Sequence, residues 1–255
     1  MEVLGKVYLV GAGPGAQDLV TLRGARLLAQ AGVVLHDALV TPEMLELCPQ
    51  ALKIAVGKRC GALSTAQAFI NKQMLDCARK YAVVVRLKGG DPMLFGRADE
   101  ELRALEEAGI EVEIVPGITT ALAAAAAAKQ PLTRRGVARS VAFFTSSTAP
   151  EHAGQVQVPD TDTLVQYMGG REATVTAQRL LDQGRGADTP VIVVENCSRP
   201  DQRILRLTLA TLARGLDAAH GPVLVMLGDA LALRVHQMAD GNRNRPTNGY
   251  LKVNA

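Results

Sequence analysis

Aromatic residues are scarce in this sequence: they make up 3% of its 255 residues, and Trp is absent. Stacking of bases on aromatic side chains, which single-stranded nucleic-acid binders use, is therefore not expected. Strong charge is also missing, since the formal net charge is +3 and the basic residues are dispersed, so we expect no nucleic-acid partner. A local cluster at Arg134, Arg135 and Arg139 is still available to a small polyanion.

Cysteine pairs and long hydrophobic runs are missing as well. The sequence has four cysteines: Cys48, Cys60, Cys77 and Cys197. They form no C-x-x-C pair and have no His at metal-ligand spacing, so we predict free thiols in a reducing compartment and no metal site. The apolar stretch Val7–Val10 is too short for a signal peptide, and Leu122–Ala128 is too short to span a bilayer. We therefore expect a cytoplasmic protein without membrane contacts.

Short apolar runs alternate with helical patterns in the first half of the chain, which predicts an α/β fold with a mostly parallel sheet. We predict strands at Lys6–Val10, Val33–His36, Lys53–Val56, Val83–Lys88 and Val112–Val115. We predict helices at Leu22–Ala31, Thr65–Tyr81, Arg97–Ala108 and Thr119–Ala128. Thr21 is the expected N-cap of the first helix, and Gly109 the expected C-terminal glycine of the third.

A second α/β stretch follows, so we expect two α/β domains at residues 1–130 and 131–239. Its predicted strands are Ser140–Thr145, Thr163–Tyr167, Pro190–Glu195 and Pro222–Leu227. Its predicted helices are Ala173–Gln183 and Thr208–Arg214. The polar segment Ser146–Asp162 is expected to be a mobile loop. The stretch Asp240–Ala255, rich in Asn, Arg and Gly, is expected to be a loose tail.

The first strand runs into a glycine-rich loop, Gly11–Ala16, that fits the dinucleotide fingerprint G-x-G-x-x-[G/A]. Asp37 ends the next strand about where a ribose-binding acid belongs. However, Pro14 has no N–H to offer a pyrophosphate, and the helix begins late, after Thr21. The loop is therefore a poor phosphate cradle, although a nicotinamide-dependent oxidoreductase stays an alternative.

Two further loops of small residues follow parallel strands: Gly89-Gly90-Asp91-Pro92 and Pro116-Gly117-Ile118-Thr119-Thr120. The carboxyl ends of parallel strands meet at one edge of the sheet, where open α/β folds bind ligands. Small residues there let the backbone approach a ligand closely. Because neither loop contains a Walker-type G-K-[S/T], this edge suits an adenosyl group better than a triphosphate.

Nine short motifs follow one another along the chain. They are Val-Gly-Ala-Gly-Pro-Gly (10–15), His-Asp-Ala-Leu-Val (36–40), Val-Gly-Lys-Arg (56–59), Arg-Leu-Lys-Gly-Gly-Asp-Pro (86–92), Phe-Gly-Arg (95–97), Val-Pro-Gly-Ile-Thr (115–119), Pro-Leu-Thr-Arg-Arg (131–135), Tyr-Met-Gly (167–169) and Val-Glu-Asn (194–196). Over roughly residues 5–230 the sequence resembles the uroporphyrinogen-III C-methyltransferases of the tetrapyrrole methylase superfamily. The run at 86–97 is specific to this branch.

The resemblance implies two α/β domains with the active-site cleft between them, and usually a homodimer. It implies S-adenosylmethionine as cofactor, with S-adenosylhomocysteine as its product. It implies a small-molecule tetrapyrrole substrate, uroporphyrinogen III, methylated at two ring carbons to give precorrin-2 via precorrin-1. That product belongs to porphyrin-type biosynthesis leading to sirohaem, cobalamin or haem d1, and the sequence does not choose among them. With no dehydrogenase–chelatase segment fused to it, we expect the later steps to belong to other proteins.

The resemblance also implies site residues. It implies cofactor contacts by Pro14, Gly89, Gly90, Asp91, Leu94, Thr119, Thr120, Met168 and Cys197. It implies proton-acceptor and proton-donor roles for Asp37 and Lys58, and substrate contacts by Arg97, Glu100 and Arg135. The sequence departs from the family at His36 (usually Tyr), at Cys197 (usually Gly) and at Ala98-Asp99 (usually Gly-Gly).

The chemistry needs cations and a proton acceptor rather than a nucleophile. A substrate with eight carboxylates calls for arginines, whose planar fork binds a carboxylate through two parallel hydrogen bonds. A pyrrole carbon is already nucleophilic, so alignment with the methyl group and removal of one proton are what remain. Asp37, Glu100 or a strongly perturbed Arg97 could take that proton. For Asp37, capping of the loop after the second strand is an equally good interpretation.

Three rival functions stay open at this point. One is a tetrapyrrole methylase acting on another precorrin, which should lack the combination found at 86–97. The second is the nicotinamide-dependent oxidoreductase, which would bind NADH and not S-adenosylhomocysteine. The third is a binding or scaffold protein without catalytic activity.

Overall fold

The computed structural model describes residues 4–57, 63–147, 157–217 and 219–233. The chain divides into two compact units, Met1–Thr120 and Ala121–Ala255. The boundary predicted from the sequence, at residue 130, assigns the alanine-rich helix to the first unit instead. That helix lies with the second unit because the buried methyl groups of Ala121 and Ala124 pack into the second unit's core.

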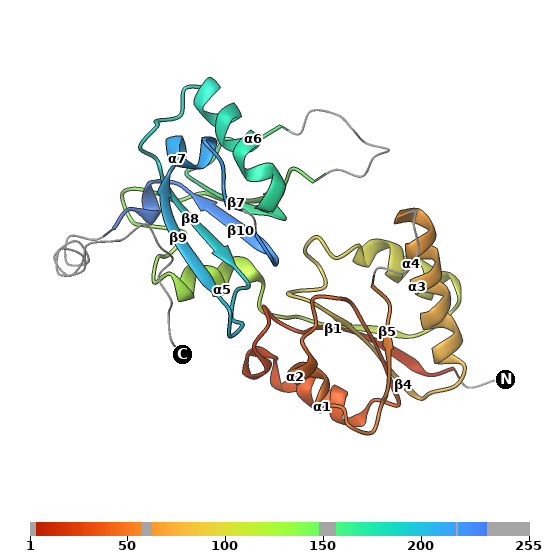
Figure 1. Cartoon of the computed structure of the whole chain (residues 1–255). Helices are drawn as coiled ribbons and strands as arrows, with labels where there is room; N and C mark the ends of the chain where they lie inside the picture. The colour runs from red at the N-terminus through yellow and green to blue at the C-terminus, as the bar shows by residue number, and fades with distance from the viewer. Residues whose placement is uncertain (1–3, 58–62, 148–156, 218, 234–255) are drawn as a thin grey trace. The chain divides into compact units, whose positions relative to one another are not determined.

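The first unit is built on a five-stranded, wholly parallel sheet (Figure 1). Its strands are β1 (Lys6–Gly11), β2 (Val33–His36), β3 (Leu52–Ala55), β4 (Val83–Lys88) and β5 (Val112–Val115), in the spatial order β3-β2-β4-β1-β5. The predicted strands and the predicted parallel sheet are confirmed. Strand β4 is central, and β1 lies between it and the edge strand β5.

Helices cover both faces of this sheet, so its inner strands β1, β2 and β4 are mostly buried. The helices are α1 (Leu22–Gln30), α2 (Pro42–Leu45), α3 (Leu63–Ala78) and α4 (Ala98–Glu107). Alternate residues of the strands enter two cores: Val7 and Leu9 pack with α3 and α4, whereas Val10 packs with α1 and α2. Figure 1 shows α3 and α4 on one side of the sheet and α1 and α2 on the other.

The helix ends of the first unit follow local sequence signals. Thr21 caps α1 by accepting a hydrogen bond from the Gly24 N–H at 3.1 Å, as predicted. A short 3-10 turn, Gln17–Leu19, separates this cap from the glycine loop, so α1 does begin late. Gly109 follows α4 with φ of 67°, the left-handed conformation expected of a C-terminal glycine. The short α2, capped by Thr41, is absent from the sequence prediction.

The second unit contains a mixed five-stranded sheet. Its strands are β6 (Val141–Thr145), β7 (Thr163–Tyr167), β8 (Pro190–Glu195), β9 (Arg203–Thr208) and β10 (Val223–Leu227), in the order β6-β7-β10-β8-β9. Only β6 and β7 pair in parallel, and the remaining pairs are antiparallel. Strand β9 was not predicted. It forms a sheet edge, and only one of its six residues is buried, so its apolar signal is weak.

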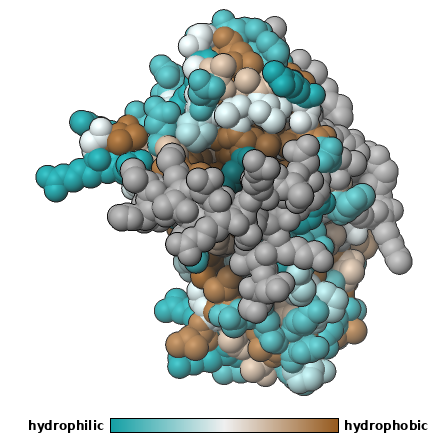
Figure 2. All heavy atoms as spheres, turned by 60° about the vertical axis from the view of Figure 1, so that its left-hand side comes forward, coloured by the Kyte–Doolittle hydropathy of each residue, from teal (hydrophilic) through white to brown (hydrophobic). Residues whose placement is uncertain are grey.

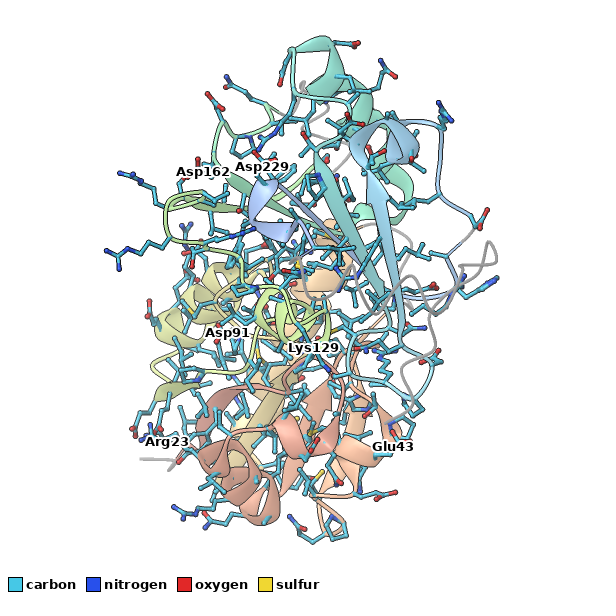
Figure 3. The ribbon with its side chains drawn as sticks, turned by 90° about the vertical axis from the view of Figure 1, so that its left-hand side faces the viewer. Arg23, Glu43, Asp91, Lys129, Asp162 and Asp229 are labelled. Atoms are coloured by element: carbon cyan, nitrogen blue, oxygen red, sulfur yellow. The ribbon has the colours of Figure 1, made fainter. Side chains whose placement is uncertain are left out.

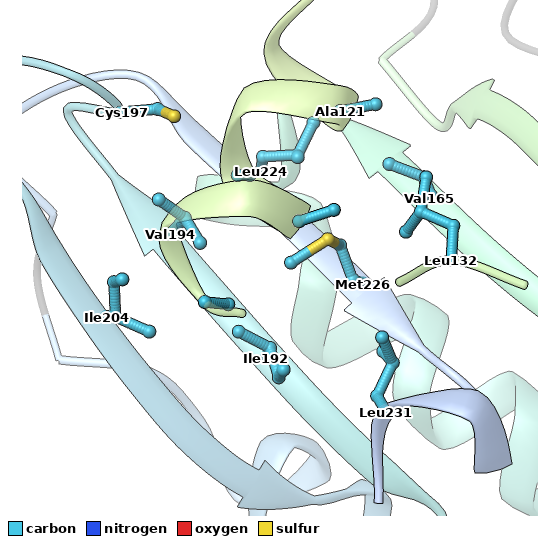
Figure 4. Close-up of a cluster of buried hydrophobic side chains, with 13 residues drawn as sticks. Ala121, Leu132, Val165, Ile192, Val194, Cys197, Ile204, Leu224, Met226 and Leu231 are labelled. Carbon is cyan, nitrogen blue, oxygen red and sulfur yellow. The ribbon is translucent and has the colours of Figure 1, made fainter. Parts of the chain in front are cut away.

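Helices again cover the two faces of this sheet. They are α5 (Thr120–Ala127), α6 (Gly169–Asp182), α7 (Leu209–Ala213) and the 3-10 turn η3 (Asp229–Leu231). Helices α6 and α7 pack with one buried cluster, and α5 and η3 pack with the other. In Figure 4 the small side chains of α5 bring its backbone close to the sheet, over Leu224 and Met226.

Within the described ranges, every helix is too short or too polar to cross a bilayer. On the face seen in Figure 2, hydrophilic residues predominate, with hydrophobic ones scattered among them. The predicted loose tail at 240–255 and residues 148–156 of the predicted mobile loop lie outside the described residues.

Candidate cofactor and substrate site

The three glycine-rich loops of the first unit meet at the carboxyl edge of its sheet, as predicted, because β4, β1 and β5 are neighbours. Gly13 and Gly90 form an antiparallel bridge between two of these loops. The Gly13 N–H donates to the Gly90 carbonyl at 3.1 Å, and the Gly90 N–H donates to the Gly13 carbonyl at 2.7 Å. The β1 and β4 loops are therefore joined by their own backbones.

The third loop lies against the other two without room for a side chain. A Cβ added to Gly11 would lie 2.5 Å from the Gly117 Cα, 2.6 Å from the Gly117 N and 2.7 Å from the Gly90 carbonyl oxygen. Real Cβ atoms do not approach backbone atoms so closely. Glycine is thus required at this point by the contact of three backbone segments.

Two carboxylates hold these loops together. Asp37, which follows β2, accepts from the Gly89 N–H at 3.1 Å through Oδ2 and from the Leu39 N–H at 2.9 Å through Oδ1. This is the loop-capping role that the sequence analysis kept as an alternative to catalysis.

Asp91, which follows β4 (Figure 3), makes the equivalent contacts on the other side of β1. Its Oδ2 accepts from the Gly117 N–H at 2.9 Å and its Oδ1 from the Met93 N–H at 2.8 Å. Each carboxylate therefore stabilises its own loop and one other part of the edge.

The N–H groups that a dinucleotide would need are engaged inside the protein. Gly13 and Gly90 donate to each other, Gly89 donates to Asp37, and Gly117 donates to Asp91. A pyrophosphate at this edge would find these four donors occupied and two carboxylates close by, which oppose an anion. The geometry thus disfavours the nicotinamide-dependent oxidoreductase, and it leaves a small-residue surface with local negative charge.

A buried group of three charges lies beneath the β4 loop. Arg86 and Lys88 of β4 and Glu101 of α4 are 4%, 3% and 1% exposed. Glu101 accepts from Arg86 Nε at 3.0 Å and from Lys88 Nζ at 2.7 Å. Burial lowers the pKa of Lys88, and Arg86 lowers it further, whereas Glu101 opposes both effects. This group was not predicted from the sequence, although two cations within the apolar run of β4 indicate a buried carboxylate partner.

Arg97 and Glu100, both predicted to contact substrate, form one unit at the start of α4. Arg97 Nε donates to Glu100 Oε1 at 2.7 Å and Arg97 Nη2 donates to Glu100 Oε2 at 2.7 Å. These hydrogen bonds hold the pKa of Glu100 below its usual range. The charge of Asp99, a departure from the family pattern, is paired with Arg103 at 2.8 Å on the exposed side of the helix.

In the second unit, Met168 and Cys197 lie at the ends of strands. Met168 follows β7 and is 51% exposed, with a left-handed φ of 56° just before α6. Cys197 follows β8 and is 4% exposed, with its thiol in the cluster that packs on α5 (Figure 4). Burial raises the pKa of Cys197 to about 11, so this thiol is no nucleophile. The side chain of Cys197 is therefore not available to a ligand.

Arg135 lies on an exposed turn whose ends pair, with the Arg134 N–H donating to the Ala138 carbonyl at 2.9 Å and the reverse bond at 2.8 Å. A groove at this turn is lined by Arg134–Ser140 and by Asp162 (Figure 3). Among the described residues, Arg134, Arg135 and Arg139 form no ion pair with a carboxylate. All three arginines are exposed, and the charge of Arg139 also acts on the carboxylate of Asp162 in the same groove.

The structure divides the candidate site residues between the two units. The first contains Pro14, Asp37, Gly89, Gly90, Asp91, Leu94, Arg97, Glu100, Thr119 and Thr120. The second contains Arg135, Met168 and Cys197. Lys58, the expected proton donor, lies outside the described residues. Within the described part of the chain, no three His, Cys, Asp or Glu side chains gather as a metal site would require.

Comparison with known proteins gives the class. Residues 6–213 match the family model described as Tetrapyrrole (Corrin/Porphyrin) Methylases. The chain is 39% identical to the solved uroporphyrin III C-methyl transferase from Thermus thermophilus, with a TM-score of 0.78, covering 89% of this chain and 93% of that one. A second Thermus thermophilus structure, complexed with S-adenyl homocysteine, is 40% identical with the same TM-score and coverage. A cobalt precorrin-4 methyltransferase is 29% identical with a TM-score of 0.74, covering 89% and 96%.

The chain also matches curated relatives that are longer than itself. The chain is 44% identical over 242 residues to siroheme synthase 2 from Yersinia pestis, covering 93% of this chain and 51% of the relative. It is also 44% identical over 236 residues to siroheme synthase from Pseudomonas fluorescens, covering 90% and 51%. The chain thus spans about half the length of the curated relatives it matches. Fold and sequence together place it among α/β methylases, and the chain belongs to the tetrapyrrole methylase family.

Proposed function

We propose that this chain catalyses S-adenosylmethionine-dependent C-methylation of uroporphyrinogen III at two ring carbons. The products are precorrin-2, formed via precorrin-1, and S-adenosylhomocysteine. The proposal transfers to this chain the activity named for the Thermus thermophilus relatives, of which the chain covers 93%. Precorrin-2 would then serve sirohaem, cobalamin or haem d1 biosynthesis. The remaining activities of the siroheme synthases are not part of the proposal, because the chain matches only 51% of them.

The observation that carries the proposal is the placement of Asp37 and Asp91 at the edge of the first sheet. Their carboxylates occupy the N–H groups of Gly89 and Gly117, and they add two negative charges beside a surface of small residues. Such an edge repels phosphate and attracts a cation. S-adenosylmethionine fits this chemistry, because its sulfur carries a positive charge and its adenosyl part carries no phosphate.

The proposed cofactor residues come from loops of both units. They are Pro14, Gly89, Gly90, Asp91, Leu94, Thr119, Thr120, Met168 and the backbone at Cys197. When bound, S-adenosylmethionine supplies an activated methyl group. The residues of this chain supply position: the loops of the first unit are held by their mutual backbone bonds, so little reorganisation is needed when a ligand arrives.

The substrate is proposed to be held through its carboxylates by Arg97 and Arg135. Arg97 is already fixed by the bidentate contact with Glu100 at 2.7 Å. Arg135 faces the groove, and Arg134 and Arg139 add positive charge there. Arginine forks in fixed positions suit peripheral carboxylates on a planar macrocycle.

Asp37 is proposed as the acceptor of the proton that leaves the macrocycle, with Lys58 as the proton donor. Each Asp37 oxygen accepts one backbone hydrogen bond, and each oxygen keeps a second lone pair. The two backbone bonds would orient the carboxylate while leaving it able to bind a proton.

Anaerobic incubation with uroporphyrinogen III and S-adenosylmethionine tests the proposal. Mass spectrometry should show a tetrapyrrole product heavier than the substrate by two methyl groups. Titration calorimetry should show S-adenosylhomocysteine binding and no NADH binding. An unshifted tetrapyrrole mass would refute the proposed reaction, and NADH binding would restore the oxidoreductase alternative.

The proton-acceptor role is tested by Asp37→Asn with Asp91→Asn as its matched control. Both residues accept two backbone N–H bonds, so both variants weaken the loops in a similar way. Asp37→Asn should lower kcat at saturating cofactor by about 100-fold or more, with little change in the Kd of S-adenosylhomocysteine. Asp91→Asn should mainly weaken cofactor binding. Equal losses of both quantities in both variants would leave Asp37 with the loop-capping role alone.

We also propose that the protein is a homodimer and that it lies in the cytoplasm. Light scattering after size exclusion tests the first: a mass of twice the 27.0 kDa chain is expected, and a monomer would contradict it. Cell fractionation tests the second.

A further inference from the structure

The buried charges of Arg86, Lys88 and Glu101 do not balance. Two cations face a single carboxylate, and all three side chains are almost fully buried. A buried charge is costly unless it is paired and hydrogen-bonded. Arg86 alone would neutralise Glu101, since its Nε lies 3.0 Å from Glu101 Oε1. Lys88 is therefore the second cation on Glu101, with Asp37 and Glu100 as further carboxylates that attract its charge, and its direct contacts explain why it is buried here.

The second direct contact of Lys88 is made with the loop after β4. Its Nζ donates to the Gly96 carbonyl oxygen as well as to Glu101 Oε2, 2.7 Å away. A Cβ at Gly96 would lie 3.0 Å from Lys88 Cε and 2.8 Å from the Pro92 carbonyl oxygen, so this loop is wrapped tightly around the lysine stem. The ammonium group thus joins the loop after β4 to the buried face of α4.

The residues on either side of Gly96 are held in an unfavourable conformation. Phe95 and Arg97 have left-handed φ angles of 52° and 54°, which cost free energy in residues that have a Cβ. Arg97 is the N-cap residue of α4, and its guanidinium binds Glu100, next to Glu101 in sequence. The Lys88 ammonium therefore binds the Gly96 carbonyl, directly before Arg97, and the Glu101 carboxylate, directly after Glu100.

We propose that Lys88 is a positioning residue: by holding the Gly96 carbonyl and Glu101 together, it aims the Arg97–Glu100 pair at the carboxylates of the tetrapyrrole. This inference rests on the proposed function, because Arg97 and Glu100 are substrate contacts only under it. Lys88 itself is buried and does not touch substrate. Without its ammonium group, the Phe95–Arg97 segment is free to relax and Arg97 loses its direction.

The test compares Lys88→Met with the matched control Arg86→Met. Each variant removes one of the two cations and leaves a one-to-one buried pair with Glu101, so each should fold. Only Lys88→Met also loses the Gly96 contact. We expect Lys88→Met to raise KM for uroporphyrinogen III by about tenfold or more, the effect of losing one charge-assisted hydrogen bond. We expect Arg86→Met to leave KM close to wild type, and both variants to keep the wild-type Kd for S-adenosylhomocysteine.

A second comparison separates positioning from general loss of structure. Because Lys88 acts through Arg97, adding Lys88→Met to an Arg97→Ala background should produce no further rise in KM. If Lys88→Met yields no folded protein by circular dichroism, Lys88→Gln, which lacks the charge and whose side chain is one bond shorter than that of lysine, takes its place in both comparisons. Equal KM values for the lysine and arginine variants, or additive effects with Arg97→Ala, would overturn the inference. A wild-type enzyme that fails to methylate uroporphyrinogen III would instead overturn the proposed function.

Discussion

Replacing Gly11 by alanine tests how tightly the three loops are joined. The new Cβ would lie 2.5 Å and 2.6 Å from the Cα and N of Gly117, and 2.7 Å from the Gly90 carbonyl oxygen. Ordinary carbon contacts lie at about 3.5–4.0 Å, so these atoms must separate by roughly 1 Å. All three neighbours are backbone atoms, so no side-chain rotation can relieve the clash.

The expected cost is worked from that geometry. Overpacking of a core lowers the free energy of unfolding by about 1–3 kcal/mol. Because the new Cβ clashes with three backbone atoms, we expect a loss of about 3 kcal/mol, at the upper end of this range. The lower unfolded-state entropy of alanine offsets roughly 0.5–1 kcal/mol of this. A net loss of about 2 kcal/mol lowers Tm by roughly 10 °C for a unit of this size. Separation of the loops should also weaken S-adenosylhomocysteine binding by about tenfold or more.

Thermal unfolding followed by circular dichroism is the assay, with titration calorimetry for the ligand. Gly186→Ala is the control, because its new Cβ would meet only the Thr189 Oγ1 at 3.7 Å, an ordinary contact. It should change stability by less than about 0.5 kcal/mol. If Gly11→Ala melts at the same temperature as wild type, the close contact of the three loops is wrong.

Two further predictions concern the second unit. The pKa of Asp162 lies below its ordinary value of 3.8 because the Ser140 hydroxyl, and then the backbone N–H groups of Arg139 and Ser140, donate to its carboxylate. The stabilisation that these hydrogen bonds give the folded protein is therefore complete above pH 3.8 and is lost as pH falls through the lower folded-state pKa. The melting temperatures of wild type and Asp162→Asn should differ at neutral pH and converge in acid. A difference in melting temperature that stays constant with pH would contradict this. Cys197, with its pKa raised to about 11 by burial, should resist iodoacetamide at mildly alkaline pH until the protein unfolds. Peptide mapping that finds it labelled as fast as a thiol in an unfolded chain would show that it is not buried.

The sequence predicts most of the first unit because its signals are local. The parallel strands are short and mostly apolar, and the helix between Thr21 and Ala31 carries its own N-cap. The elements missed have weaker local signals. Strand β9 is an edge strand with little buried surface, and the four-residue α2 is too short for a periodic pattern. The sequence predicts the domain boundary at residue 130 and the contacts divide the chain after Thr120, because alanine methyl groups carry no signal for the sheet they pack against.

The candidate site was predicted in part for a related reason. Glycines and their flanking strands reveal that the loops meet at one edge, since strand order in a parallel sheet brings their ends together. The hydrogen-bond partners of Asp37 and Asp91 could not be predicted from the sequence. Gly89 follows Asp37 by 52 residues and Gly117 follows Asp91 by 26 residues, so each contact depends on how the strands pair. The role of Lys88 was hidden for the same reason: its contact with Glu101 depends on how α4 docks against β4.

The place of β1 between β4 and β5 has a consequence for how this protein acquires its structure. Lys6 pairs with Val83, and Val7 pairs with Val112, so the first strand to be synthesised finds its neighbours only much later in the chain. Contacts between residues so distant in the sequence lose loop-closure entropy before their strand pairing adds favourable free energy, and this slows folding. Until β5 joins, one flank of β1 is an open edge, and the third loop is absent. A ribosome-bound chain that ends before Val115 should therefore be unable to take up its cofactor, and ligand capture marks completion of the first sheet.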